Sequence, residues 1–386
     1  MRLFPFFPLP ARDPGEPHRA ATQLELFFDL ISVVAIAAVT AGLHHAISEG
    51  HGLDKLPVFL FLFTAIWWAW MNFTWFASAF DNDGPAYRVL VMVIMAGEVI
   101  FAGGAAHMFE TLELGWGIVG WSIMRVGMAA LWFRAAANPE YRATCLRYGF
   151  GIIIAQLGWI AFYFLAEPGS ANFYLLGALF FLVEFAVPVF AERARMTPFH
   201  RHHMVERYGL LTIISLGEII LAISLGFGAL YGGAVTAAPI ITALSALVIV
   251  FALFWLYFGE PEHLHSRTLT QSFLWGYGHV FIFAAIAVLG AGVAAELDLA
   301  TGHGHHADQA AVSKWLGLPL AVFLLALFVT CCSHIASARK YALPVMALVS
   351  VAAAFAAAPS WVFAIIAVVA VIWRVPLNEP AAQSGA

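Results

Sequence analysis

Two acidic residues stand one helical turn apart at the start of an apolar run, residues 24–40. They are Glu25 and Asp29, and Ser32 continues the same helix face one turn further on. Such a face attracts cations, or it is neutralised by arginines. We expect Glu25 to be neutralised at the boundary of the run. We expect Asp29, which lies deeper, to contact a cation that this acidic face attracts. Three arginines are the candidate partners for neutralisation: Arg134, Arg193 and Arg207.

Three other ionisable residues lie far inside apolar runs: Glu98, Arg125 and Glu218. Arginine keeps its proton, so Arg125 requires an anion or water nearby. We expect that anion to be Glu98, because a short loop joins the two runs, and Glu218 is the second choice. This trio is typical of a protonation or ion site, and equally of an ion pair that fixes the packing of helices. Both interpretations stay open.

Three more side chains have a chemical and a structural interpretation. Glu206 opens the run at 205–228, where we expect an interfacial ion pair. Glu184 is expected to pair with Arg193 or Arg195. His279 can relay protons near neutral pH, although a hydrogen-bonded core histidine is the commoner case.

The composition requires that these residues sit in a membrane. Of 386 residues, 62% are hydrophobic and 11% charged, and the mean hydropathy is +0.86. Soluble domains are about a quarter charged, so this chain has too little polar surface to cover a water-soluble particle. The sequence therefore predicts an all-α integral membrane protein, with the lipid bilayer as its partner.

Scanning for runs of about 20 apolar residues predicts about twelve transmembrane helices. The last two runs are short, so eleven or ten spans remain open. The first six runs are 25–47, 56–79, 86–107, 115–135, 146–166 and 171–191. The last six are 205–228, 239–259, 271–295, 314–334, 341–357 and 360–374.

Basic residues test this count independently. If both termini are cytoplasmic, the outward loops hold only Lys55 and Lys314, and Arg125 belongs to neither side, as the positive-inside rule requires. The other 15 of the 18 basic residues face inward: Arg2, Arg12, Arg19, Arg88, Arg134, Arg142, Arg147, Arg193, Arg195, Arg201, Arg207, Arg267, Arg339, Lys340 and Arg374.

Twelve helices divide into two parallel six-helix repeats, each opening with an acidic residue and each with an aromatic second helix. We expect a cytoplasmic leader over 1–22, a first repeat over 23–192 and a basic linker over 193–204. A second repeat over 205–375 and a tail over 376–386 follow.

Histidines, net charge and enzyme signatures bear on the partners and the activity of the chain. The loop histidines His303, His305 and His306 are a weak metal motif, and we predict no metal and no cofactor. A net charge of −5 argues against nucleic acid. No Walker, GxSxG or HExxH signature occurs, so we do not expect an enzyme. Three histidines in the linker region are expected among lipid headgroups: His200, His202 and His203.

Several stretches resemble the bacterial low-temperature-requirement A membrane proteins. They are ELFFDLISVVAIAAVT, WWAWMNFTWFASAFDND, IMRVGMAALWFRAAANPEYR, VERYGLLTIISLGEIILAIS and FGEPEHLHSRTLTQSFLWGYGHVFIFAAIAVLGAG. The resemblance runs from about residue 20 to about residue 295, and beyond that only hydropathy agrees. It implies a multi-pass protein of the bacterial plasma membrane, linked to growth in the cold, without a settled activity. The motif positions are Glu25, Asp29, Arg125, Glu206, Glu218, His263, His265 and His279; an acidic residue at Glu98 is not a hallmark of that family.

The E-x-x-x-D spacing of Glu25 and Asp29 is also similar to helix 1 of endolysosomal-type potassium and proton channels. That resemblance implies two six-helix repeats whose helices 1 and 7 line a pore. Here Phe28 and Leu30 replace small residues, and Leu210 stands where the second aspartate would recur, so the same pore is not implied.

Together these patterns favour a proton or monovalent-cation transport protein with a charged site near mid-membrane. A scaffold or stress sensor whose buried charges are structural is the alternative. The sequence leaves open whether the chain forms a homo-oligomer.

Overall fold

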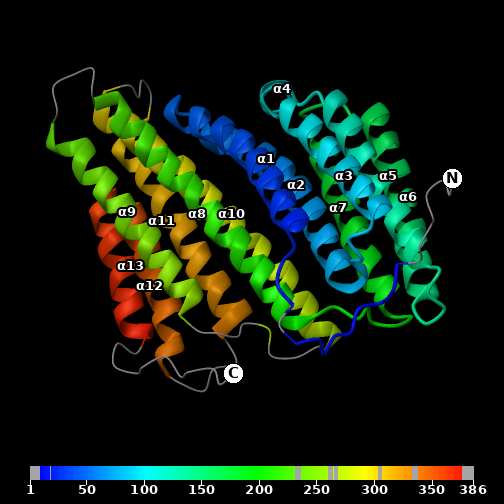
Figure 1. Ribbon diagram of the computed structural model, residues 1–386. Helices are drawn as coiled ribbons and strands as arrows, with labels where there is room; N and C mark the ends of the chain where they lie inside the picture. The colour runs from blue at the N-terminus through cyan, green and yellow to red at the C-terminus, as the bar shows by residue number, and fades with distance from the viewer. Residues whose placement is uncertain are drawn as a thin grey trace. The chain divides into compact units, whose positions relative to one another are not determined.

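A computed structural model describes residues 9–17, 19–230, 236–259, 264, 268–302, 307–332 and 338–375, with the side chains of 226–230 and 332 excepted. Its described residues form helices and no strand, as the sequence predicts (Figure 1). The chain divides into two compact units. The first comprises residues 1–42, 55–211 and 267–269, and the second comprises the remainder.

The first unit contains most of α1 (Gln23–Ser48), α2 (Gly52–Phe80) and the first part of α8 (Arg201–Leu230). The others are α3 (Pro85–Gly103), α4 (Ala105–Thr111), α5 (Gly115–Ala135), α6 (Arg142–Leu165) and α7 (Ala171–Glu192). Within it α3 packs on α5, α5 on α6 and α6 on α7. The predicted run at 86–107 is therefore two helices, because α3 ends at Gly103 and α4 starts anew at Ala105.

The second unit contains the rest of α8, then α9 (Ala237–Phe258), α10 (Leu269–Thr301) and α11 (Gln309–Leu327). A π-helical turn (Phe328–Cys332) extends α11, and a 3₁₀ turn (Ala338–Tyr341) precedes α12 (Ala342–Phe355) and α13 (Ser360–Arg374). Here α11 packs on α12, and α13 packs on both α9 and α12.

Eleven of the described helices are long and apolar enough to cross a membrane. The twelfth predicted span is α13, whose 15 residues fall short of the roughly 20 that cross hydrocarbon. Large apolar side chains lie exposed on several helix faces, for example Val126, Ile154 and Leu175, each at least 66% exposed. Water would penalise so much exposed apolar surface and lipid does not, so the chain is a multi-pass membrane protein.

Close helix contact fixes α3 against α5. A Cβ atom on Gly97 would lie 2.6 Å from the carbonyl oxygen of Gly120, and one on Gly120 would lie 2.5 Å from that of Gly97. Only glycine permits this backbone approach. The crossing therefore fixes the position of Glu98, which follows Gly97 on α3.

Candidate functional site

The first turn of α1 closes with reciprocal hydrogen bonds between Thr22 and Glu25. The backbone N–H of Thr22 donates to Oε2 of Glu25 at 2.7 Å, and the backbone N–H of Glu25 donates to Oγ1 of Thr22 at 3.3 Å. This is a capping box, which satisfies two N–H groups that the start of a helix leaves unpaired. The sequence T-x-x-E at residues 22–25 is its signature. The box fixes the Glu25 carboxylate in place.

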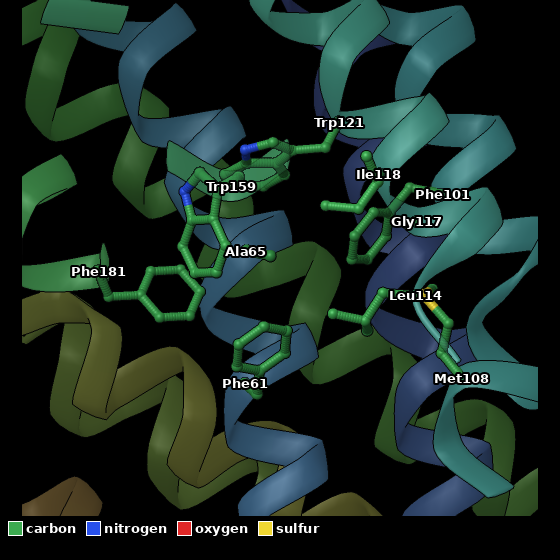
Figure 2. A pocket seen from close by; sticks show the side chains of 10 residues that line it. All are labelled: Phe61, Ala65, Phe101, Met108, Leu114, Gly117, Ile118, Trp121, Trp159 and Phe181. Atoms are coloured by element: carbon green, nitrogen blue, oxygen red, sulfur yellow. The ribbon is translucent and has the colours of Figure 1, made fainter. Parts of the chain in front are cut away.

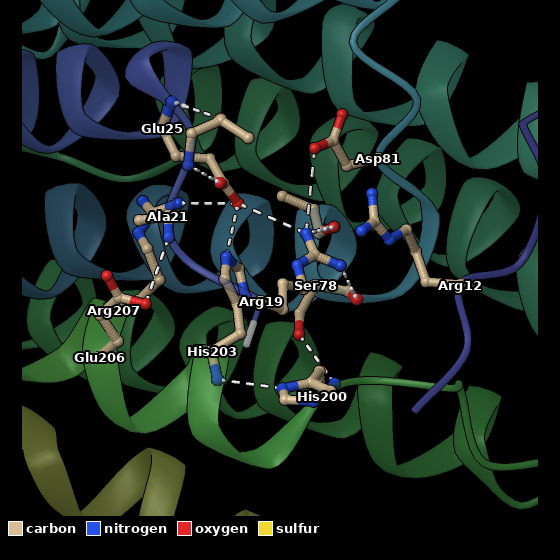
Figure 3. A network of polar contacts seen from close by, with 12 residues as sticks. Arg12, Arg19, Ala21, Glu25, Ser78, Asp81, His200, His203, Glu206 and Arg207 are labelled. Atoms are coloured by element: carbon tan, nitrogen blue, oxygen red, sulfur yellow. Dashed lines mark hydrogen bonds and ion pairs between the residues drawn. The ribbon is translucent and has the colours of Figure 1, made fainter. Parts of the chain in front are cut away.

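Glu25 is the centre of a buried charged network, drawn in Figure 3. Its Oε1 lies 3.0 Å from Nε2 of His203 and 3.1 Å from Nη1 of Arg207, and all three side chains are fully buried. Arg19 approaches the same oxygen at 3.9 Å. The expected neutralisation of Glu25 by Arg207 is therefore present.

The buried His203 corrects the sequence interpretation, which placed it among lipid headgroups. Its side chain is 0% exposed and lies against Glu25 instead. The available signal was its position just before the predicted run at 205–228, because a helix that begins a few residues earlier puts His203 one turn from Glu206.

The Asp29 carboxylate is occupied by an ion pair and a hydrogen bond. Its Oδ1 accepts from Nη2 of Arg207 at 2.5 Å and from Nε1 of Trp70 at 2.7 Å. The other oxygen, Oδ2, has no hydrogen-bond partner in the described part of the chain. We expected Asp29 to be the functional acid and Glu25 the structural one; in the structure the same guanidinium neutralises both.

The outer part of the network lies at the end of α2. Arg19 donates to the carbonyl oxygens of Ser78 at 2.7 Å and Ala77 at 2.8 Å, and lies 3.9 Å from Asp81. Burial raises the pKa of the Asp81 carboxyl above its usual value, and burial lowers the pKa of the Arg19 guanidinium. Both shifts show that this end of the network is poorly hydrated.

Glu98 is fully buried, and within the described residues neither of its oxygens has a hydrogen-bond partner. The Ser32 hydroxyl lies beside it, and the charge of Asp29 acts on it. Ser32 Oγ likewise completes no hydrogen bond to a described residue. Glu98 thus lies beside Ser32, which shares a face of α1 with Asp29, the partner of Arg207.

Arg125 pairs with Glu184, so the predicted pairing with Glu98 is wrong. Its Nη2 lies 2.9 Å from Oε1 of Glu184, and its guanidinium lies over the ring of Trp121 at 4.4 Å. Indole N–H groups of Trp68 and Trp159 donate to the same carboxylate, at 3.0 Å and 3.1 Å. The predicted pairing of Glu184 with Arg193 or Arg195 is also wrong. Arg195 contacts Glu140.

A small cavity adjoins this ion pair, between Trp121, Trp159, Phe61 and Phe101 (Figure 2). Its volume is about 20 Å³, and its lining is apolar. That volume accommodates roughly one water-sized molecule.

The other predicted residues lie apart from this network. Glu206 is exposed and accepts from the backbone N–H of Ala21 at 3.2 Å, in place of the expected arginine. In the second unit, His279 contacts the carbonyl of Trp275 at 2.7 Å and the hydroxyl of Tyr257 at 3.1 Å. It is the hydrogen-bonded core histidine that the commoner interpretation predicts.

Glu218 belongs to the second unit, where it is partly buried and has no ion pair with a described residue of that unit. Five of the histidines named above lie outside the described residues: His263, His265, His303, His305 and His306. The described part of the chain contains no group of three metal-ligating side chains.

Comparison with known families decides the relationship of the chain. The family described as bacterial low temperature requirement A protein (LtrA) matches residues 20–375. The chain belongs to this family. The LtrA match extends beyond residue 295, where the motif resemblance ended, so the last helices are part of the family unit as well.

A protein of Rhizobium meliloti (strain 1021), described as uncharacterized, is 28% identical to this LtrA-family chain over 278 residues. The match covers 68% of this chain and 66% of that relative. The description of that relative names no activity.

Proposed function

We propose that this LtrA-family protein is a transport-type protein for protons or monovalent cations. The observation that carries the proposal is the charge imbalance of the buried network. Three carboxyl groups, those of Glu25, Asp29 and Asp81, face two guanidinium groups, those of Arg19 and Arg207.

A buried site with one uncompensated negative charge is costly, and binding one positive charge removes that cost. A proton on His203 supplies such a charge, and so does a cation entering from solution. The site is therefore suited to gain and lose one positive charge, which is the elementary step of proton or cation movement.

The proposal places the protein in the bacterial plasma membrane with both termini in the cytoplasm, because basic residues concentrate on that side in the predicted topology. The network then lies at the cytoplasmic end of α1. Growth in the cold, which the family name connects with these proteins, would depend on ion or pH homeostasis in a stiffened membrane.

The second candidate is a scaffold or stress sensor that moves no ion. The ion pair of Arg125 with Glu184 favours it, because the Glu184 carboxylate also accepts from two indole N–H groups and the guanidinium lies over the ring of Trp121. Under this function the buried charges only fix helix positions.

Flux measurements in liposomes separate the two. Purified protein is reconstituted, and proton and potassium fluxes are followed under an imposed voltage and a pH gradient. Transport predicts flux in the wild type, its loss in Asp29→Asn that remains folded, and its retention in Glu110→Gln, which changes an exposed acid. Glu218→Gln tests whether the second unit takes part. Absence of flux in folded wild type contradicts transport and supports the scaffold.

A further inference from the structure

We propose that Glu98 is a proton-binding residue that exchanges its proton with Asp29 through the hydroxyl of Ser32. The inference rests on the proposed transport function and makes it more specific, because it names the proton as the ion.

Within the described part of the chain, the Glu98 carboxyl group is isolated from solvent and from hydrogen-bond partners. It is 0% exposed and has no hydrogen-bond partner among the described residues. A buried carboxylate without a counter-charge or donors is strongly disfavoured, and taking up a proton removes the charge. The side chain is therefore held as a neutral acid while the protein rests.

The charged groups that the structure describes around Glu98 leave it without a direct cation. Asp29 on α1 is the group whose charge acts on Glu98. The buried cation of the adjacent helix α5, Arg125, is occupied by Glu184 on α7. Arg207 on α8 reaches this region through Asp29. Glu98 consequently sees one acid and no direct cation among the described residues.

The Glu98 position suits a proton better than a metal cation. Potassium in a filter is held by rings of oxygens that replace its hydration shell. The groups that act on Glu98 are the Ser32 hydroxyl and the charge of Asp29. A proton needs a single oxygen, which the Glu98 carboxyl group itself supplies.

A hydroxyl group both donates and accepts, so Ser32 can pass a proton on. The O–H bond of Glu98 breaks and its proton bonds to Ser32 Oγ, while the original Ser32 hydroxyl proton bonds to the Asp29 carboxylate. One proton has then moved, and the negative charge has moved from Asp29 to Glu98. Arg207, 2.5 Å from Asp29 Oδ1, favours the charged form of Asp29 and so opposes this transfer at rest.

Infrared difference spectroscopy tests the proton directly and needs no flux. The carbonyl stretch of a protonated carboxyl group is recorded on reconstituted protein across neutral pH, in H₂O and D₂O. We expect a band that shifts in D₂O, disappears in Glu98→Gln, changes frequency in Glu98→Asp and stays in Glu110→Gln. In Ser32→Ala we expect the band to remain and its hydrogen–deuterium exchange to slow at least tenfold.

A wild type without any band assignable to Glu98 overturns the proposal, and so does unchanged exchange in folded Ser32→Ala. If Glu98→Gln does not fold, the frequency change in Glu98→Asp makes the assignment. A Glu98 band without flux in liposomes contradicts transport and leaves proton binding intact. Flux without the band contradicts proton binding at Glu98 and leaves transport intact.

Discussion

Nη2 of Arg207 on α8 lies 2.5 Å from Oδ1 of Asp29 on α1, although 178 positions separate the two residues. The same guanidinium lies 3.1 Å from Glu25, so one buried cation joins two acids of α1. The start of α1 and the start of α8 are thereby held together inside the first unit.

Arg207→Gln should destabilise the first unit by about 3–5 kcal/mol, because it leaves two buried carboxylates without their cation. Thermal unfolding in detergent, followed by near-UV circular dichroism, measures the effect. The exposed Arg142→Gln is the control and should match the wild type. Adding Asp29→Asn to Arg207→Gln should restore part of the loss, since it removes one of the stranded charges. Equal stability of Arg207→Gln and wild type would contradict the role of this cation.

The Arg125–Glu184 pair should behave as one unit. Either Arg125→Met or Glu184→Gln alone is expected to cost about 3–5 kcal/mol, and the double variant should cost less than the sum of both. Arg125→Lys should not rescue, because lysine does not reproduce the planar contact with Trp121. Unfolding midpoints give the energies, and tryptophan fluorescence reports the local environment of Trp121 and Trp159. Additive losses would show that the two side chains act independently.

The α3–α5 crossing predicts that Gly120→Ala is disruptive. The added Cβ would lie 2.5 Å from the carbonyl oxygen of Gly97, and backbone atoms cannot move aside as a flexible side chain does. We expect a loss of about 1–3 kcal/mol, which is usual for overpacking. Gly103→Ala on α3 is the matched control, because nothing lies within 4 Å of its added Cβ. Thermal unfolding of both variants decides the point, and a tolerated Gly120→Ala would contradict the close approach.

The stability that Asp81 contributes to the folded protein should fall as pH rises. Burial raises the pKa of Asp81 in the folded protein, so the folded state keeps this proton to higher pH than the unfolded state does. The contribution of Asp81 to the free energy of unfolding is complete below the unfolded-state pKa of its carboxyl group. That contribution is lost as pH rises through the folded-state pKa. Asp81→Asn should therefore equal the wild type in acid and become more stable than it as pH rises. Unfolding midpoints between about pH 4 and about pH 8 measure this difference.

Glu16 provides a comparison of opposite sign. A hydrogen bond from Arg12 lowers the pKa of Glu16, so its contribution is present above the unfolded-state pKa and is lost on acidification. Glu16→Gln should consequently lose stability near neutral pH and match the wild type in acid. The same trend with pH in both variants would contradict the assignment of either shift.

The helices and the membrane class followed from the sequence, because hydrocarbon selects for apolar runs of fixed length wherever they occur. Eleven predicted spans correspond to long helices, and the short last run became the short helix α13. The neutralisation of Glu25 was also predictable, since its position at the end of a span restricts the partners to nearby interfacial arginines.

The partners of deeper residues depended on tertiary structure. Depth along a helix can be counted from sequence, but the direction of a side chain around the helix axis depends on which neighbours pack there. Glu98 and Arg125 lie on helices in close contact, yet Glu98 is directed to Ser32 on α1 and Arg125 to Glu184 on α7. Counting along the chain could therefore find these charges, and only helix packing decided which of them are paired and which one is left alone.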